Sequence, residues 1–273
     1  PLKRPALLAG QTCMLHLEFA LRRATAWAPA GFAMAWAQIA LPFAARAAAG
    51  RKKSAARTRV AGRVAIAANE RAIECIGDEF ALLVDRDAAA IASFAWRDQA
   101  ILENGPVATC WRAPTDNDGL RQGWMRDVQG VLRTWRLLGL DRLERRATGV
   151  RFAAGRDGSA RLELDAELIG ADPSQRARHR QQIRIEPSGV LHVVDTIEIP
   201  AAWSDVPRVG VVMRLPGEFS QLAWLGLGPH ETYPDRKASG RFGRFAGRVA
   251  EQYVPYVVPQ EHGHHTETRW LSL

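Results

Sequence analysis

Short runs in which apolar and polar residues alternate fill most of the chain after Val64. Alternation with a period of two is typical of strands that bury one face. Turn residues such as Pro, Gly, Asp and Ser separate the runs. The predicted strands are residues 80–84, 161–168, 182–186, 190–195, 209–215 and 222–227. We therefore predict an all-β fold, a large antiparallel β-sandwich, from about residue 64 onward.

Two further strands are predicted near the start of the chain. Residues 14–21 and 32–39 alternate in the same way, and Trp27 to Gly31 form a turn between them. Two strands cannot bury a core by themselves. We therefore expect residues 1–41 to end a β-sandwich domain whose other strands precede Pro1, and the chain to be a piece of a longer protein.

A basic, alanine-rich stretch connects these two parts. Residues 42–63 show no sustained apolar stripe, so they are predicted to be a linker to a second domain of residues 64–273. One helix is predicted over residues 123–138, because apolar side chains recur there every three or four positions.

Charge and composition exclude several classes of protein. The 273 residues carry a formal net charge of +8, but residues 46–63 alone hold seven Lys and Arg and no Asp or Glu. Since a nucleic-acid surface needs basic groups spread over a folded face, no nucleic-acid partner is expected. Residues 24–45 are uncharged, but Pro29, Gln38 and Pro42 argue against a membrane-spanning helix. Three widely spaced cysteines fit a reducing compartment, and we expect a cytoplasmic protein without a membrane partner.

Residues 111–119, with the sequence WRAPTDNDG, combine groups that bind sugars: an indole, a guanidinium, two carboxylates and an amide. The Asp-Asn-Asp-Gly segment does not predict a calcium loop, because the other ligand positions and the distal glutamate are missing. A turn rich in Asp and Asn side chains and ended by Gly119 is the alternative interpretation of the same residues.

Residues 224–236, with the sequence WLGLGPHETYPDR, place a strand end before a Gly-Pro bend and then gather polar side chains. On a continued strand, His230 and Glu231 would point to opposite faces, so these neighbours do not predict an acid–base pair. The glycines would instead allow the backbone of another domain to approach closely.

Residues 259–267, with the sequence PQEHGHHTE, hold three histidines within four positions. Metal ligation is one interpretation, but no cysteine is near and the spacing matches no common zinc motif. A polar turn is favoured, and no metal site is predicted. The sequence also has no GxSxG motif that would indicate a nucleophilic serine.

Taken together and in this order, these stretches resemble the C-terminal part of the β-galactosidases of glycoside hydrolase family 2. The resemblance covers nearly all of residues 13–273. It implies that residues 1–41 end an immunoglobulin-like domain. It also implies that residues 64–273 form the family's small-chain β-supersandwich, similar in fold to galactose mutarotase and truncated at its C-terminus. The segments that carry the resemblance are residues 24–28, 111–119, 224–236 and 253–270.

In such enzymes this domain packs against the catalytic barrel and helps to shape the mouth of the sugar site. The resemblance places at the rim of that site Arg112, Asp116, Asn117, Asp118 and Gly119. It implies positions facing another domain or the sugar for Trp224, His230, Glu231, Tyr233, Asp235, Arg236 and Glu261. The segment from Gly119 to Trp124 matches a stretch that moves in such enzymes when the substrate goes deeper into the pocket. At position 262 this sequence has His, where members of the family frequently have Asn.

Retaining glycosidases use two carboxyl groups about 5 Å apart across the sugar. In the resembled family both are glutamates of the barrel, so no catalytic residue and no hydrolysis by this chain alone are expected. The resemblance implies Mg²⁺ and Na⁺ in the full enzyme, held by ligands outside this chain. The implied partners are the barrel and other domains, a β-galactoside, and further copies of the enzyme in a homo-oligomer.

Two other functions stay open at this point. A mutarotase-like sugar epimerase would need a general acid and a general base, for which the candidates are His192, His230, Glu231 and Glu261. A non-catalytic carbohydrate-binding module would hold a galactoside by stacking on Trp111, Trp224 or Trp270.

Overall fold

The computed structural model describes residues 5–7, 11–43, 62–120 and 130–273. These residues divide into two compact units. Of the described residues, the first unit contains 5–7, 11–43, 222–247 and 263–272, and the second contains 62–120, 130–221, 248–262 and Leu273. The predicted linker, residues 42–63, lies almost entirely outside the described residues, and the predicted domain boundaries stay a prediction.

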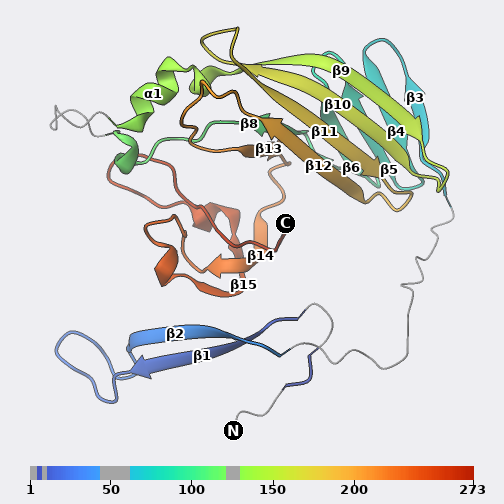
Figure 1. Ribbon diagram of the computed structural model, residues 1–273. Coiled ribbons are helices and arrows are strands. Elements are labelled where there is room, and N and C mark those ends of the chain that lie inside the picture. Colours follow the sequence, from blue (N-terminus) through green and yellow to red (C-terminus); the bar gives the residue numbers. More distant parts are fainter. Residues whose placement is uncertain (1–4, 8–10, 44–61, 121–129) are drawn as a thin grey trace. The chain divides into compact units, whose positions relative to one another are not determined.

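The first unit contains a two-stranded and a three-stranded antiparallel sheet (Figure 1). The hairpin pairs β1 (Cys13–Ala20) with β2 (Ala33–Leu41), close to the predicted ranges. The second sheet has the order β15–β14–β16. Its strands are β14 (Gln221–Gly228), β15 (Arg241–Arg248) and β16 (Trp270–Ser272).

The hairpin has one apolar and one mixed face. Leu15 pairs with Ile39 and Leu17 with Ala37, so these side chains share a face because alternate residues of a strand point the same way. Leu17 and Ile39 are exposed. On the other face, the Gln38 carboxamide donates a hydrogen bond to the Phe242 carbonyl and accepts one from the Phe242 N–H, each at 2.7 Å.

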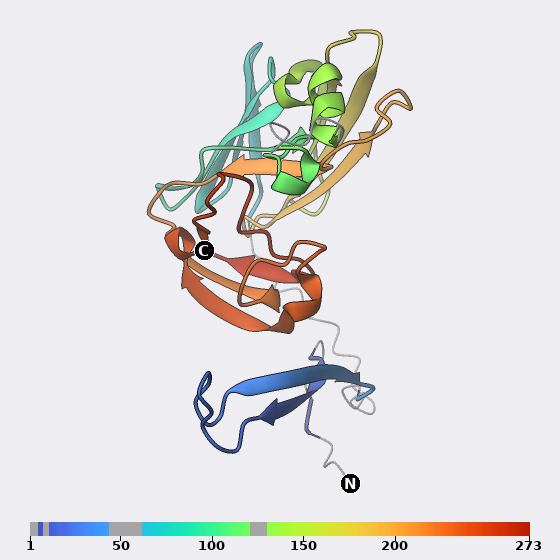
Figure 2. The same ribbon diagram turned by 90° about the vertical axis from the view of Figure 1, so that its left-hand side faces the viewer.

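The second unit is a sandwich of antiparallel sheets, whose layers Figures 1 and 2 show from two sides. One layer runs β3–β4–β5–β6–β7, and the other runs β12–β11–β10–β9, while β8 pairs with β13. The first layer consists of β3 (Ala65–Ala68), β4 (Ala72–Ile76), β5 (Phe80–Asp85), β6 (Ala90–Trp96) and β7 (Gln99–Leu102). The other consists of β9 (Glu144–Ala154), β10 (Ala160–Ile169), β11 (Arg176–Ile185) and β12 (Leu191–Glu198). The remaining pair is β8 (Asn104–Thr109) and β13 (Gly210–Arg214).

The core lies between the two layers and follows the period-two pattern of the sequence. In β10, Leu162, Leu164, Ala166 and Leu168 are buried, and the residues that alternate with them are more exposed. A larger apolar cluster joins the five-stranded layer to one end of β10 and β11, and a second cluster lies around Trp135, Leu140 and Trp203. The sandwich is thus held together by burial of apolar side chains from strands far apart in sequence.

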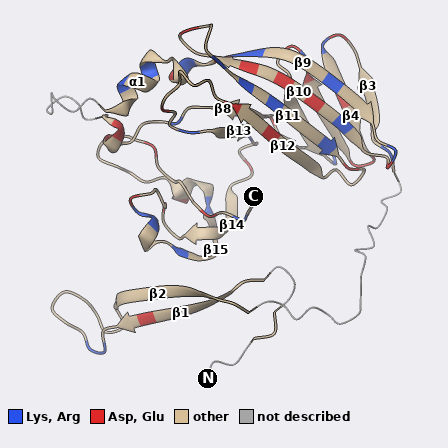
Figure 3. Cartoon of the chain, viewed as in Figure 1, with Lys and Arg blue, Asp and Glu red and all other residues tan. Residues whose placement is uncertain are grey.

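The outward face of β9–β12 carries charges of both signs in alternation, as Figure 3 shows. The Arg151 guanidinium pairs with Glu163 at 3.0 Å and with Asp165 at 2.6 Å, and Arg180 also pairs with Asp165. Such exposed pairs contribute only about 0–1 kcal/mol each. Charges of both signs therefore balance one another across this face.

The structure confirms the prediction of an all-β sandwich and changes the predicted helix. Helix α1 spans Val131–Leu137, and Gly130 precedes it in an extended conformation. The first part of the predicted helix, residues 123–129, lies outside the described residues. Short 3-10 helices occur at Asp116–Asp118, Leu140–Arg142, Lys237–Ser239 and Val249–Gln252. Among the described residues, no helix is both long and apolar enough to cross a membrane.

Candidate functional site

The loop of residues 111–119 follows β8 and folds around the carboxylate of Asp118, which is 8% exposed. The Arg112 guanidinium donates two hydrogen bonds to it, at 2.6 and 3.1 Å. The Thr115 N–H donates a third at 2.7 Å and the Thr115 hydroxyl a fourth at 2.9 Å. Gly119 follows with φ +101°, a left-handed conformation that favours glycine. The Asp118 carboxylate therefore fixes the internal shape of the loop.

The surroundings of Asp118 also set its protonation. Burial alone would raise the pKa of this carboxyl, but the hydrogen bonds from Arg112 and Thr115 and the charge of Arg112 outweigh burial and lower the pKa. Asp118 is therefore ionised at neutral pH, and its charge is neutralised inside the loop by Arg112. The sequence suggests Arg112 and Asp118 for the rim of a sugar site, and in the structure these two side chains pair with each other.

Two other segments of the second unit hold the loop from outside. The Glu261 N–H donates to the Pro114 carbonyl at 3.1 Å, and the Asp116 N–H donates to the Gln260 side-chain oxygen at 3.0 Å. The Glu261 carboxylate, 12% exposed, forms an ion pair with Arg208. Residues 260–261 thus reach the loop from a distant part of the sequence, and Arg208 pairs with one of them.

The base of the loop packs on Trp135, the aromatic residue of α1. The Arg112 guanidinium lies 5.2 Å from the centre of the Trp135 ring, a cation–π arrangement, and the Trp111 ring meets Trp135 edge-on. The Trp135 indole N–H donates to Asp205 at 2.9 Å. Trp111 is half-buried. The indole proposed for sugar stacking therefore also supports the loop.

Gly130 is a part of this arrangement that sequence reasoning missed. A Cβ atom at Gly130 would lie 2.4 Å from the Asp118 carbonyl oxygen. Because only glycine permits so close an approach, the start of α1 can pack directly on the end of the loop. A glycine immediately before an apolar helical stretch is the sequence signal that could have indicated it.

The loop leaves two polar side chains for an outside partner. Within the part of the chain that the structure describes, the Asp116 carboxylate and the Asn117 carboxamide form no hydrogen bond or ion pair. Asn117 is exposed, and Asp116 is partly exposed. Of the candidate rim residues, these two have the hydrogen-bonding capacity that recognition of a sugar hydroxyl needs.

The second candidate stretch, residues 224–236, lies in the first unit, where it makes mainly internal contacts. The Glu231 carboxylate is buried, accepts from the Arg236 guanidinium at 2.7 Å and accepts from the Gly263 N–H at 3.0 Å. His230 is hydrogen bonded to Ser239 at 2.8 Å. Asp235 is exposed.

Aromatic residues of this unit pack on its histidines. The Trp224 indole is 3% exposed, and its ring centre lies 4.3 Å from that of His265. Tyr233 lies against His264 with ring centres 5.0 Å apart. Burial lowers the pKa of His265. The buried Trp224 offers no open face for a sugar, whereas Trp270 is 40% exposed.

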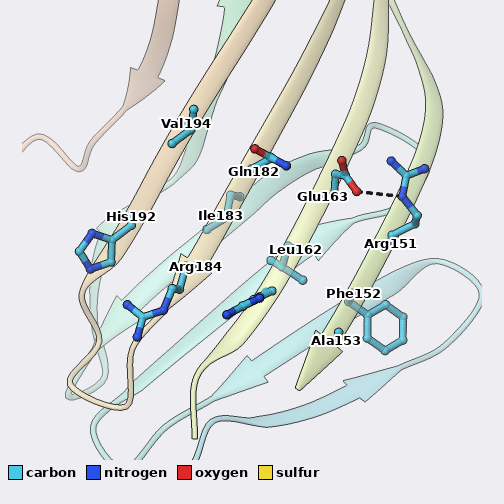
Figure 4. A pocket seen from close by; sticks show the side chains of 11 residues that line it. Arg151, Phe152, Ala153, Leu162, Glu163, Gln182, Ile183, Arg184, His192 and Val194 are labelled. Atoms are coloured by element: carbon cyan, nitrogen blue, oxygen red, sulfur yellow. Dashed lines mark hydrogen bonds and ion pairs between the residues drawn. The ribbon is translucent and has the colours of Figure 1, made fainter. Parts of the chain in front are cut away.

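The remaining histidine candidate, His192, lies on the outward face of the four-stranded sheet. It is one of the residues that line a hollow of about 340 Å³ on that face, whose side chains Figure 4 shows. His192 is hydrogen bonded to Glu186 at 3.0 Å, and Arg184 is also paired with Glu186. Of the other charged groups that line this hollow, Arg151 is paired with Glu163, as the figure shows.

A buried polar network inside the sandwich was not indicated by any motif. The fully buried His179 ring is hydrogen bonded to Asp195 at 2.8 Å. Gln181, also buried, donates to the same carboxylate at 2.8 Å and to the Pro106 carbonyl at 3.0 Å. In the sequence, the one signal for the burial of His179 and Gln181 is their position: they lie on the same face of β11 as its buried apolar residues. The network ties β11 and β12 to β8.

A metal site was not predicted, and the three histidines of residues 262–265 do not gather ligands. In the described ranges, no three His, Cys, Asp or Glu side chains come together in a way that could hold a metal ion. His262 meets the Tyr253 ring edge-on.

Comparison with known proteins gives consistent matches along the chain. A family profile described as "Beta galactosidase small chain" matches residues 76–273, and one described as "Beta-galactosidase, domain 4" matches residues 1–42. The "Beta-galactosidase" of Arthrobacter sp. (strain B7) is 32% identical over 98% of this chain and 25% of its own length. The "Beta-galactosidase" of Priestia megaterium is 29% identical over 95% of this chain and 23% of its own length. The "Beta-galactosidase 2" of Enterobacter cloacae is 31% identical over 98% and 26%, respectively. The chain therefore spans about a quarter of the length of these curated relatives.

Proposed function

Because the chain belongs to the β-galactosidase small-chain family, we propose that it works as part of a β-galactosidase of glycoside hydrolase family 2. In this proposal the second unit supports the enzyme as a scaffold, and residues 112–119 form part of the rim of its galactoside site. The reaction is hydrolysis of a terminal β-galactoside with retention, and its catalytic carboxyl groups lie in a barrel outside this chain.

The state of the carboxylates supports a rim role over a catalytic role. A retaining glycosidase needs one carboxylic acid and one carboxylate nucleophile open to the sugar. Asp118, Glu261 and Glu231 are instead paired with arginines, at Arg112, Arg208 and Arg236. In each pair the guanidinium engages at least one oxygen of the carboxylate. We therefore propose that this chain alone does not hydrolyse galactosides.

The observation that carries the rim proposal is the braced loop with its two unengaged side chains. Asp118 and Arg112 fix the loop internally, while Asp116 and Asn117 present a carboxylate and an amide. Hydrogen bonds of these groups to sugar hydroxyls need a fixed geometry, because ordering a flexible loop on binding costs free energy.

The apolar face of the β1–β2 hairpin supports the proposed assembly with other parts of the enzyme. Phe19 is 67% exposed, and Leu17 and Ile39 on the same strand faces are exposed as well. A two-stranded sheet with an open apolar face needs a second layer to be stable. We propose that preceding immunoglobulin-like strands supply this layer, and that the whole enzyme is a homo-oligomer.

The Mg²⁺ and Na⁺ of the proposed full enzyme are assigned to other parts of it. The described residues provide no group of three His, Cys, Asp or Glu side chains suited to a metal ion.

Hydrolysis of a chromogenic galactoside tests the proposal. The chain is assayed alone and after mixing with a barrel-containing polypeptide that lacks this region. We expect activity only in the mixture. Hydrolysis by the chain alone, or a mixture without activity despite demonstrated association, would contradict the proposal.

A matched pair of variants then tests the rim. The double substitution Asp116→Ala, Asn117→Ala is expected to lower kcat/KM of the mixture by about 10-fold or more, because each hydrogen bond that involves a charged group contributes about 1.5–3 kcal/mol. Gln99→Ala changes an exposed side chain of β7 and serves as the control. Equal effects of the two variants would refute the rim role.

A further inference from the structure

We infer that Gln260 and Glu261 are positioning residues of the rim loop, which they hold in place without contacting the sugar themselves. This inference rests on the proposed rim function of residues 112–118. It concerns a separate question, namely what fixes the place of the loop on the sandwich.

The hydrogen bonds within the loop do not determine where the loop lies on the sandwich. Among the described residues, the Asp118 carboxylate accepts hydrogen bonds from Arg112 and Thr115, which belong to the same loop. Such bonds fix the shape of a loop, but they leave its orientation to contacts with the rest of the fold. Besides the packing of the loop on α1, hydrogen bonds to the loop come from two distant segments, residues 207–208 and 260–261.

The contacts of the three segments close a ring of hydrogen bonds. Arg112 donates through Nε to the Pro207 carbonyl at 3.3 Å and through its Nη atoms to Asp118. The neighbouring Arg208 pairs with the Glu261 carboxylate. The Glu261 N–H returns to the loop at the Pro114 carbonyl. Each segment therefore contacts both of the others, and the loop cannot shift without breaking a bond.

Gln260 has the most direct connection to the rim side chains. Its side-chain oxygen accepts the N–H of Asp116, one of the two residues that carry an unengaged side chain. A bond to the backbone of that residue holds in place the backbone from which its carboxylate projects. The contact needs an acceptor oxygen on Gln260 and does not need its NH₂ group, so glutamate at this position would keep the contact.

The side chain and the backbone of Glu261 make different contacts in this ring of hydrogen bonds. Its partly buried carboxylate neutralises Arg208, while its backbone N–H makes the bond to Pro114. Removing the carboxylate would leave Arg208 unpaired near the loop base, but the backbone bond could still form. A Glu261 variant is therefore expected to loosen the ring indirectly.

Amide hydrogen exchange of the intact chain, followed by mass spectrometry of peptides that cover residues 112–119, tests the inference. Gln260→Ala is expected to speed exchange at the Asp116 amide by about 2- to 10-fold, the effect of losing one hydrogen bond. Gln260→Glu is expected to restore slow exchange, and the control Gln99→Ala to leave it unchanged. Unchanged exchange in Gln260→Ala would overturn the inference, as would failure of Gln260→Glu to rescue it.

The same variants in the mixture with a barrel-containing polypeptide give a second, independent readout. Gln260→Ala is expected to raise KM several-fold while kcat changes less, and Gln260→Glu to restore KM. An equal loss of kcat in both variants would refute a positioning role. If the mixture has no activity at all, the proposed function fails, whereas the exchange experiment on the chain alone still decides the inference.

Discussion

Removal of the Asp118 carboxylate tests whether the loop is held by the ion pair at its centre. Asp118→Ala takes away the acceptor of four hydrogen bonds and leaves Arg112 without its carboxylate partner. The side chains of Asp118 and Arg112 are only 11% and 18% exposed, respectively, so water would replace the lost hydrogen bonds incompletely. Hydrogen bonds to charged groups contribute about 1.5–3 kcal/mol, and we expect a loss of about 2–4 kcal/mol in the free energy of unfolding.

A double-mutant cycle separates the pair from other effects of each substitution. Urea unfolding of the wild type, Arg112→Ala, Asp118→Ala and the double variant, followed by circular dichroism, gives the coupling energy. We expect about 1.5–3 kcal/mol for this partly buried pair. The matched control is the Arg97–Glu79 pair, which has a similar distance of 2.6 Å but is 68% and 44% exposed. For it we expect at most about 1 kcal/mol.

The stabilisation by the Asp118 carboxylate should depend on pH in a defined direction. Because Arg112 and Thr115 lower the pKa of Asp118, the ionised carboxylate stabilises the folded state above the ordinary Asp pKa of about 4. This contribution disappears as the pH falls through the lower folded-state pKa. The difference in stability between wild type and Asp118→Asn should therefore shrink below about pH 4. A coupling energy below about 0.5 kcal/mol, or a difference that grows with acid, would refute the reasoning.

Three further outcomes are expected from the structure. Asp195→Ala leaves buried donors around His179 without an acceptor, and we expect urea unfolding to show a loss of about 1–3 kcal/mol; an unchanged midpoint would contradict a structural role of the network. Gly130→Ala places a Cβ in contact with backbone, and we expect a Tm several degrees lower, which differential scanning calorimetry measures against an exposed Ala control substitution. Burial raises the pKa of Cys75 and Cys110 to about 11, so a thiol reagent at pH 8 should label these residues only after unfolding; rapid labelling of the native chain would show that they are accessible.

The strands and the family could be read from the sequence because both depend on local information. Period-two alternation of side chains gives strand positions within one or two residues, as for residues 161–168, found as Ala160–Ile169. The long motifs WRAPTDNDG and WLGLGPHETYPDR indicated the family, which the comparisons then showed. The strand of residues 182–186 was placed less well, since β11 begins at Arg176. Its first half alternates buried His179 and Gln181 with arginines, and these polar residues hide the apolar period.

The roles of individual polar residues were decided by tertiary structure alone. The motif around Asp116–Asp118 showed which chemical groups are present. It did not show that the Asp118 carboxylate pairs with Arg112, whereas the Asp116 carboxylate forms no hydrogen bond within the described residues. Likewise, nothing local connects Glu261 with Arg208 or Gln260 with Asp116, which are separated by 53 and 144 positions. A hydrogen bond depends on distance and direction in space. Only the packing of the sandwich, driven by burial of apolar faces, brings these segments within reach of one another.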